Sequence, residues 1–149
     1  MRIAIGTDHG GYHLKSLLIG ELKKAGHRVM DLGTFSPEPC DYPSIGAAVA
    51  QAVSKKKADR GILLCKSGGG MAIVANKFPR VRAVVAQTIS LAKHSREHND
   101  ANILVLGAQH MTKGSARAVM KAWLTTPSAG GRHLRRVKQI ERIERALHV

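Results

Sequence analysis

Aromatic side chains are scarce in this chain of 149 residues, at 3% of the total, so Leu, Ile, Val, Ala and Met must fill the core. Few rings are available to stack on bases, which argues against nucleic acid as the partner. The chain is 44% hydrophobic and carries charges of both signs. We therefore expect residues 1–149 to fold as one domain.

Cysteine is also rare, and so are long apolar runs. Cys40 lies in a Pro-rich segment and Cys65 ends an apolar run, so no disulfide framework is indicated. The apolar N-terminus turns polar at Thr7-Asp8-His9, too early for a signal-peptide core, and no segment approaches membrane-spanning length. A reducing cytoplasm is the expected location, with no membrane partner.

Acidic residues are outnumbered, with ten Asp and Glu against 24 Lys and Arg and a net charge of +14. Half of this excess lies between Lys113 and the C-terminus, where nine basic residues face two Glu. A basic surplus favours anionic partners. A solvated basic surface is the simpler explanation, because net charge governs non-specific association rather than function.

Apolar periodicity alternates between strand and helix along the whole chain. This alternation predicts an α/β, three-layer Rossmann-like fold with a five-stranded parallel sheet and helices on both faces. The expected strands are 2–7, 28–32, 61–65, 82–86 and 103–107; the expected helices are 11–25, 44–56, one after Gly70 that ends before Pro79, one from Thr88 or Ser90 to His98, 113–124 and 134–147.

Polar residues follow three of the expected strands: Asp8-His9, the segment Cys65–Gly70, and His110. In open α/β sheets ligands bind beyond the carboxyl ends of the strands. The sequence therefore predicts a ligand site at this edge of the sheet.

The segment Cys65-Lys66-Ser67-Gly68-Gly69-Gly70 is the most informative motif. A glycine loop that opens a helix can direct several N–H groups at one point, which suits a phosphate or a reaction oxyanion. The same field activates a thiol as a base or nucleophile. A buried structural cysteine before a loop that needs glycine is an equally valid interpretation.

Gly6–Gly11 is glycine-rich, yet neither G-x-G-x-x-G nor a P-loop motif occurs, which excludes dinucleotide and nucleoside triphosphate binding of those types. Asp8 could accept sugar hydroxyls and His9 could meet an anion, or Asp8 could simply be a helix N-cap. We favour the functional interpretation for this Asp-His pair at a strand end.

Two further motifs lie outside this edge. His94–His98 matches the zinc pattern H-x-x-E-H but has no third ligand, so we expect no metal site. His98-Asn99 should lie at the opposite end of the sheet, which suggests a site completed by a long loop or by a second subunit. Arg132 and Arg136 share a helix face and could grip a phosphate, although a solvated basic helix is slightly favoured on spacing alone.

Together these segments resemble the ribose-5-phosphate isomerase B family, which includes galactose-6-phosphate isomerase subunits and allose-6-phosphate isomerases. The matching motifs run from residue 2 to beyond 140: Asp8–Gly11, Asp41–Pro43, Gly61–Gly70, Ala75–Phe78 with Arg82-Ala83, His98–Asn102, and Gly130–His133 with Arg136.

The resemblance implies a cofactor-free aldose–ketose isomerase. It also implies a homodimer or dimer of dimers with shared active sites, and the helix at about 133–147 is expected at the subunit interface. The implied roles are Cys65 as base between C1 and C2, Ser67 as proton relay, Gly68, Gly69 and Gly70 as oxyanion donors, His98 in ring opening, Asp8, Tyr42 and Asn99 at sugar oxygens, and His9, Arg132 and Arg136 at the phosphate.

Lys66 departs from the family, which usually has Gly after the cysteine. Its side chain could disturb the loop, lower the pKa of Cys65 or meet the substrate's anion; our hypothesis is that it points to solvent. The leading substrate is ribose 5-phosphate. The alternatives are another aldose phosphate, such as allose 6-phosphate or galactose 6-phosphate, and a non-catalytic protein that binds sugar phosphate or nucleic acid.

Overall fold

Five parallel strands form a single sheet in the computed structural model, which describes residues 1–147. Their order across the sheet is β2-β1-β3-β5-β4. The predicted five-stranded parallel sheet is therefore confirmed. The strands are β1 (Arg2–Thr7), β2 (Arg28–Asp31), β3 (Arg60–Cys65), β4 (Ala83–Val85) and β5 (Ile103–Gly107).

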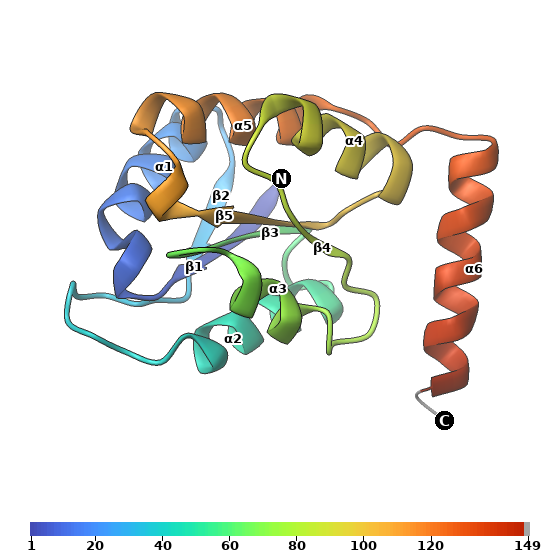
Figure 1. Ribbon diagram of the computed structural model, residues 1–149, viewed down its shortest axis with the longest axis horizontal. Helices are drawn as coiled ribbons and strands as arrows, with labels where there is room; N and C mark the ends of the chain where they lie inside the picture. Colours follow the sequence, from blue (N-terminus) through green and yellow to red (C-terminus); the bar gives the residue numbers. More distant parts are fainter. Residues whose placement is uncertain (148–149) are drawn as a thin grey trace.

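Helices cover both faces of the sheet, as predicted: α1, α4 and α5 lie on one face and α2 and α3 on the other (Figure 1). No helix within the described residues is long and apolar enough to cross a membrane. The helices are η1 (His9–Gly11), α1 (Tyr12–Lys24), α2 (Tyr42–Ser54), α3 (Gly69–Ala75), α4 (Ile89–Asn99), η2 (Ala108–His110), α5 (Lys113–Thr125) and α6 (Arg132–Leu147).

Each central strand contributes side chains to two hydrophobic cores, because successive side chains point to opposite faces of a sheet. In β3, Ile62 and Leu64 join the core under α1, α4 and α5, whereas Leu63 and Cys65 join the core under α2 and α3. Trp123 of α5, fully buried, is the largest side chain of the first core. The scarce aromatic residues thus leave the cores to aliphatic side chains, as the composition predicts.

The strand β4 forms one edge of the sheet and has only three residues. The Asn76 side chain binds the outward-facing backbone of Ala83 at both groups. Asn76 Nδ2 donates to Ala83 O at 2.9 Å, and Asn76 Oδ1 accepts from Ala83 N–H at 2.8 Å. A side-chain amide therefore occupies the place that a further strand would take.

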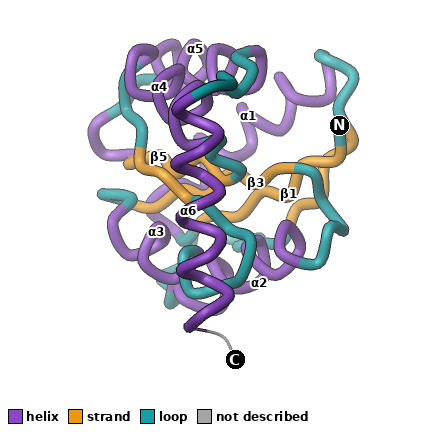
Figure 2. Tube along the Cα trace, turned by 90° about the vertical axis from the view of Figure 1, so that its right-hand side faces the viewer, coloured by secondary structure: helices purple, strands orange, loops and turns teal. Residues whose placement is uncertain are grey.

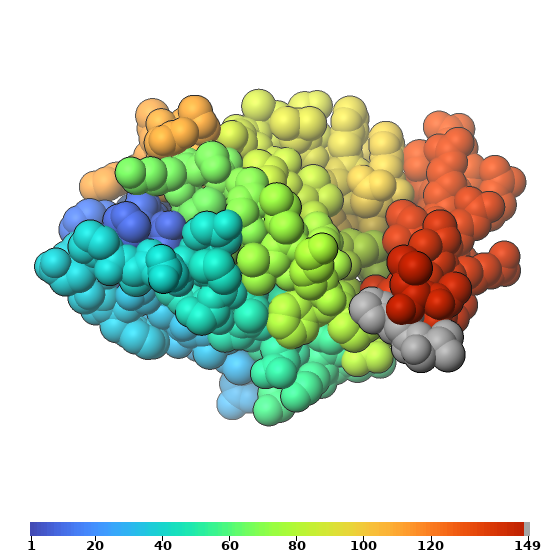
Figure 3. Space-filling view, turned by 60° about the horizontal axis from the view of Figure 1, so that its bottom comes forward, coloured from blue at the N-terminus to red at the C-terminus, as the bar shows by residue number. Residues whose placement is uncertain are grey.

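The helix α6 stands outside the three layers and runs across one end of them (Figures 1 and 2). In the space-filling view it projects from the body of the molecule (Figure 3). Its one buried residue is Val137, at 4% exposure. Glu144 Oε1 accepts from Arg80 N–H at 2.8 Å, and Glu141 Oε1 lies 3.8 Å from Arg82 Nη1. Few contacts therefore attach α6 to its own chain.

Candidate active site

The carboxyl ends of β1, β3 and β5 bring three polar segments together. A methyl group on Gly10 would lie 3.1 Å from Asp8 Oδ1 and 3.2 Å from the backbone nitrogen of Lys66. On the other side, Gln109 N–H donates to Lys66 O at 3.1 Å. The predicted clustering of these segments at one edge of the sheet is therefore present in the fold.

Cys65 ends β3 and is buried, with 6% of its surface exposed. Its Sγ accepts a hydrogen bond from Gly68 N–H at 3.0 Å. Gly68 has φ 91° and precedes the first residue of α3, so this turn needs glycine. The loop therefore folds back over the sulfur and directs a backbone N–H at it, an arrangement that suits a thiolate.

Tyr42, the first residue of α2, lies against the first turn of α3. A methyl group on Gly70 would be 2.5 Å from Tyr42 Cζ and 2.6 Å from its hydroxyl oxygen. The same group on Gly69 would meet nothing closer than Ser67 Oγ at 3.9 Å. Gly70 therefore provides the space for the phenol, while Ser67 and Gly69 are exposed.

Asp8 and His9 reach the same edge from β1. Asp8 Oδ1 accepts from Gly10 N–H at 2.9 Å and caps η1, so the N-cap interpretation is correct for this oxygen. Its Oδ2 makes no hydrogen bond within residues 1–147. His9 Nδ1 accepts from Cys40 N–H at 3.2 Å, which leaves Nε2 as the donor that can meet an anion.

Lys66 is exposed, and its side chain leaves the loop across Gly10, where its Cγ would lie 2.9 Å from an added methyl group. Its φ is not positive, so a side chain at this position does not strain the loop. Its ammonium forms no ion pair in the part of the chain that is described. These observations favour the hypothesis that Lys66 points to solvent.

The remaining predicted residues lie at the opposite end of the strands, where β5 begins. Cys65 pairs with Gly107 at the end of β5, whereas His98 and Asn99 end α4, before the start of β5. Five residues of strand separate the two places, roughly 13 Å or more at about 3.3 Å per residue. The single chain therefore does not bring His98 and Asn99 to the thiol.

Arg132 and Arg136 belong to this second group, because both lie in the first turns of α6. The helix stands at the opposite end of the molecule from the loop that leads into α2 (Figure 1). The predicted residues thus form two groups. The first comprises Asp8, His9, Tyr42 and Cys65–Gly70; the second comprises His98, Asn99, Arg132 and Arg136.

A column of three imidazoles connects α4 to α6. The His98 ring stacks on His94 at 4.9 Å between centroids and 11° between planes, and on His133 at 4.2 Å and 2°. Burial, followed by the charges of His98 and the neighbouring arginines, holds the pKa of His133 below its usual value. Among residues 1–147, no group of three His, Cys, Asp or Glu is placed to hold a metal.

His133 was missed as a site residue in the sequence, although it lies inside the quoted motif. The spacing of His94 and His98 predicts a shared helix face, but no sequence signal places α6 beside α4. This contact becomes visible only in the fold.

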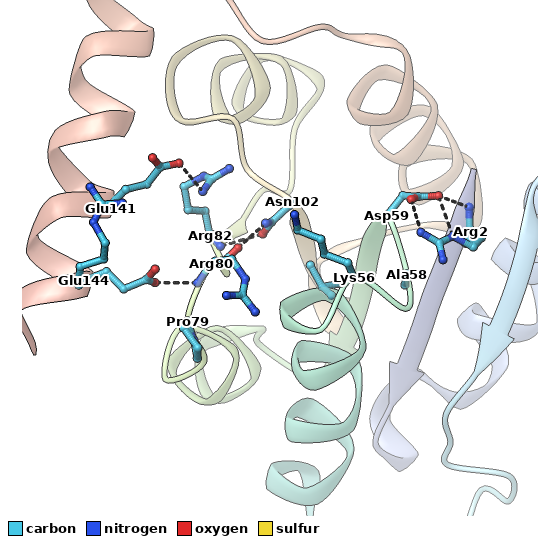
Figure 4. A pocket seen from close by; sticks show the side chains of 12 residues that line it. Arg2, Lys56, Ala58, Asp59, Pro79, Arg80, Arg82, Asn102, Glu141 and Glu144 are labelled. Atoms are coloured by element: carbon cyan, nitrogen blue, oxygen red, sulfur yellow. Dashed lines mark hydrogen bonds and ion pairs between the residues drawn. The ribbon is translucent and has the colours of Figure 1, made fainter. Parts of the chain in front are cut away.

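A cavity of about 710 Å³ lies elsewhere, at the amino ends of the strands beside α6 (Figure 4). Several of its charged groups are paired with one another: Arg2 Nη2 lies 2.8 Å from Asp59 Oδ1, and Arg82 Nη1 lies 3.8 Å from Glu141 Oε1. No predicted site residue lines it. We therefore assign the candidate site to the carboxyl edge and not to this cavity.

Comparison with known proteins gives consistent results. A family model described as Ribose/Galactose Isomerase matches residues 3–140. The ribose-5-phosphate isomerase B of Escherichia coli is 43% identical over 143 residues, which cover 96% of each chain. The ribose-5-P isomerase B of Listeria innocua is 40% identical over 144 residues, covering 97% of each.

Solved structures agree. The ribose-5-phosphate isomerase B of Clostridium thermocellum has a TM-score of 0.96 and 46% identity, with 99% of both chains covered. That of Mycoplasma genitalium, with bound ribulose-5-phosphate, has a TM-score of 0.94 and 34% identity, with 97% of this chain and 96% of the other covered.

These matches confirm the family resemblance, the Rossmann-like fold and the reaction class, that of an aldose–ketose isomerase for sugar phosphates. They extend over nearly the whole length of the chain and include both groups of predicted residues. This chain belongs to the ribose/galactose isomerase family.

Proposed function

We propose that this chain converts ribose 5-phosphate to ribulose 5-phosphate through a cis-enediolate, with Cys65 as the base. The observation that carries the proposal is the buried Cys65 sulfur, which accepts the Gly68 N–H at 3.0 Å where α3 begins. Such a donor stabilises negative charge on the sulfur, and a thiolate can act as a general base.

In the proposed reaction, the Cys65 thiolate removes the proton from C2 of the open-chain aldose and returns it to C1. Ser67 relays the proton between the oxygens on C1 and C2. The negative charge that develops on these oxygens would meet the N–H groups of Gly68, Gly69 and Gly70, of which the Gly68 N–H faces the Cys65 sulfur before substrate binds. Only protons move in these steps, so the reaction needs no redox cofactor.

The first group of residues would hold the sugar from one side. Tyr42 and Asp8 Oδ2 are placed to bind hydroxyl groups, and His9 Nε2 is the donor toward the phosphate. The second group would complete the site: His98 transfers the protons of ring opening, Asn99 binds a sugar oxygen, and Arg132 and Arg136 bind the phosphate.

Because the two groups lie at opposite ends of the strands in one chain, we propose that the second group comes from a neighbouring copy. A homodimer, or a dimer of dimers, would then contain two equivalent shared sites per pair. In this arrangement α6 contributes to the subunit interface and the whole chain, residues 1–149, acts as one domain in the cytoplasm.

Ribose 5-phosphate is favoured over allose 6-phosphate and galactose 6-phosphate because the similar proteins from E. coli and L. innocua carry the ribose-5-phosphate name. A protein that only binds sugar phosphate or nucleic acid would not need the thiol, Ser67 and His98 together. The basic surplus alone does not favour that alternative.

The test is ketose formation from ribose 5-phosphate, beside allose 6-phosphate, without added metal. Cys65→Ala should lower kcat by at least about a thousandfold, roughly 4 kcal/mol. Cys40→Ala is the matched control and should stay within about threefold of the unmodified chain, because Cys40 contributes its backbone N–H to His9. Full activity in Cys65→Ala would exclude the thiol as the base, and no turnover of either sugar by the unmodified chain would remove the proposal.

A further inference from the structure

His133, the second residue of α6, has no part in the proposed reaction although it touches a residue that has one. We infer that His133 is a positioning residue for His98, whose ring it holds in a fixed plane beside the phosphate-binding face of α6. This inference rests on the proposed function, in which His98 transfers the protons of ring opening.

The geometry of the column carries the inference. The rings of His98 and His133 are parallel within 2° at a centroid distance of 4.2 Å, and the His94 ring also stacks on His98, at 4.9 Å and 11°. His98 is exposed and its ring makes no hydrogen bond to residues 1–147. Stacking on the His94 and His133 rings is therefore the interaction that restricts its rotation about the side-chain bonds.

The position of His133 in α6 links ring opening by His98 to phosphate binding by Arg132 and Arg136. It lies between Arg132 and Arg136 in the sequence. Val137, the buried residue of α6, comes directly after Arg136. Ring contact with His98 therefore fixes the first turns of α6 relative to the end of α4. A substrate whose phosphate is bound by the two arginines would then lie at a fixed distance from the His98 imidazole.

The charges around the column suit a neutral His133. Its Nδ1 is buried and has no hydrogen-bond partner among the described residues. Burial lowers its pKa most, followed by the charges of His98 on α4 and of Arg132 and Arg136 on α6, whereas Glu97 on α4 opposes them. A neutral ring can stack on His98 in either of its protonation states, as a positioning role requires.

Three variants of the full chain test the inference. His133→Ala removes the ring, His133→Phe keeps a flat ring without charge, and His13→Ala makes the first change at an exposed site on α1. With ribose 5-phosphate, His133→Ala should lower kcat by at least about tenfold while KM changes less than about threefold. His133→Phe should recover kcat to within about threefold of the unmodified chain, and His13→Ala should have no effect.

A second measurement does not depend on activity. In the NMR spectrum of protein labelled at histidine, the ring-proton signal of His98 should move in His133→Ala, because the stacked ring current is lost. The inference is overturned if His133→Ala keeps kcat within about twofold, if His133→Phe is no better than His133→Ala, or if the His98 signal stays in place. An unmodified chain without isomerase activity would instead contradict the proposed function, and the His98 signal would still decide whether the rings stack.

Discussion

At the scale of single residues, Gly70 gives the sharpest prediction, because the ring of Tyr42 occupies the space beside its Cα. Gly70→Ala must displace Tyr42, because the added Cβ would lie only 2.5 Å from Tyr42 Cζ. We expect KM for the sugar phosphate to rise at least about tenfold, measured by steady-state kinetics.

Gly69→Ala is the matched control one residue earlier. Its added methyl group meets nothing within 3.9 Å, and the backbone N–H is kept, so kinetics should stay within about twofold of the unmodified chain. Equal effects of the two substitutions would mean that Tyr42 has no part in binding.

Lys66 carries a second prediction at this scale. Its side chain is exposed, has no ion-pair partner among residues 1–147 and does not strain the loop. Lys66→Gly should therefore change kcat by less than about tenfold, which corresponds to about 1.4 kcal/mol. A larger loss, with Lys66→Gln as the comparison that keeps a side chain, would assign the ammonium to the site.

Residue roles could be predicted where local backbone determines them. The glycine after Ser67 has the positive φ that a loop before a helix requires, and Asp8 caps the turn that follows β1. The stacking of His133 on His98 could not be predicted, because it depends on how α6 packs against α4. The roles assigned from the family resemblance stay predictions until the variants are measured.

At the scale of elements, the sequence periodicity predicted all five strands and the order of helices between them. The ends differ by a few residues: α2 begins at Tyr42 rather than at Ser44, and α6 begins at Arg132 rather than at 134. The order of the strands was not predicted, because the helical connections can place β5 on either side of β4. The structure places β5 beside β3 and β4 at the edge.

The attachment of α6 gives a prediction at this scale. Val137 is the buried residue of the helix, so Val137→Ala removes two buried methyl groups at about 0.8 kcal/mol each, or about 1.6 kcal/mol in total. Denaturant unfolding should show this loss of stability. The exposed neighbour in Lys138→Ala should change the free energy of unfolding by less than about 0.5 kcal/mol.

A loss in Lys138→Ala as large as that in Val137→Ala would mean that helix propensity, rather than the buried contact, sets the stability of α6. Activity provides an independent readout. If α6 positions Arg132 and Arg136, loosening the helix should raise KM before it lowers kcat.

At the scale of the whole molecule, the separation of the two groups of residues predicts complementation between inactive chains. Cys65→Ala and Arg136→Ala, unfolded together and refolded as a mixture, form mixed pairs in which one site carries neither change. A one-to-one mixture should recover about a quarter of the activity of the unmodified chain.

The control is the same treatment of each variant alone, which should recover nothing beyond its own activity. A mixture whose activity is only the average of the two variants would mean that each chain completes its own site. Gel filtration of the mixture shows whether pairs have formed.

The amide of Asn76 on Ala83 has a consequence for how copies of this chain can meet. The outward N–H and C=O of Ala83, the first residue of the edge strand β4, are already hydrogen-bonded, so they cannot pair with a strand of a second copy. Edge-to-edge pairing of β4 strands from one copy to the next, which could extend the sheet without limit, is thereby disfavoured.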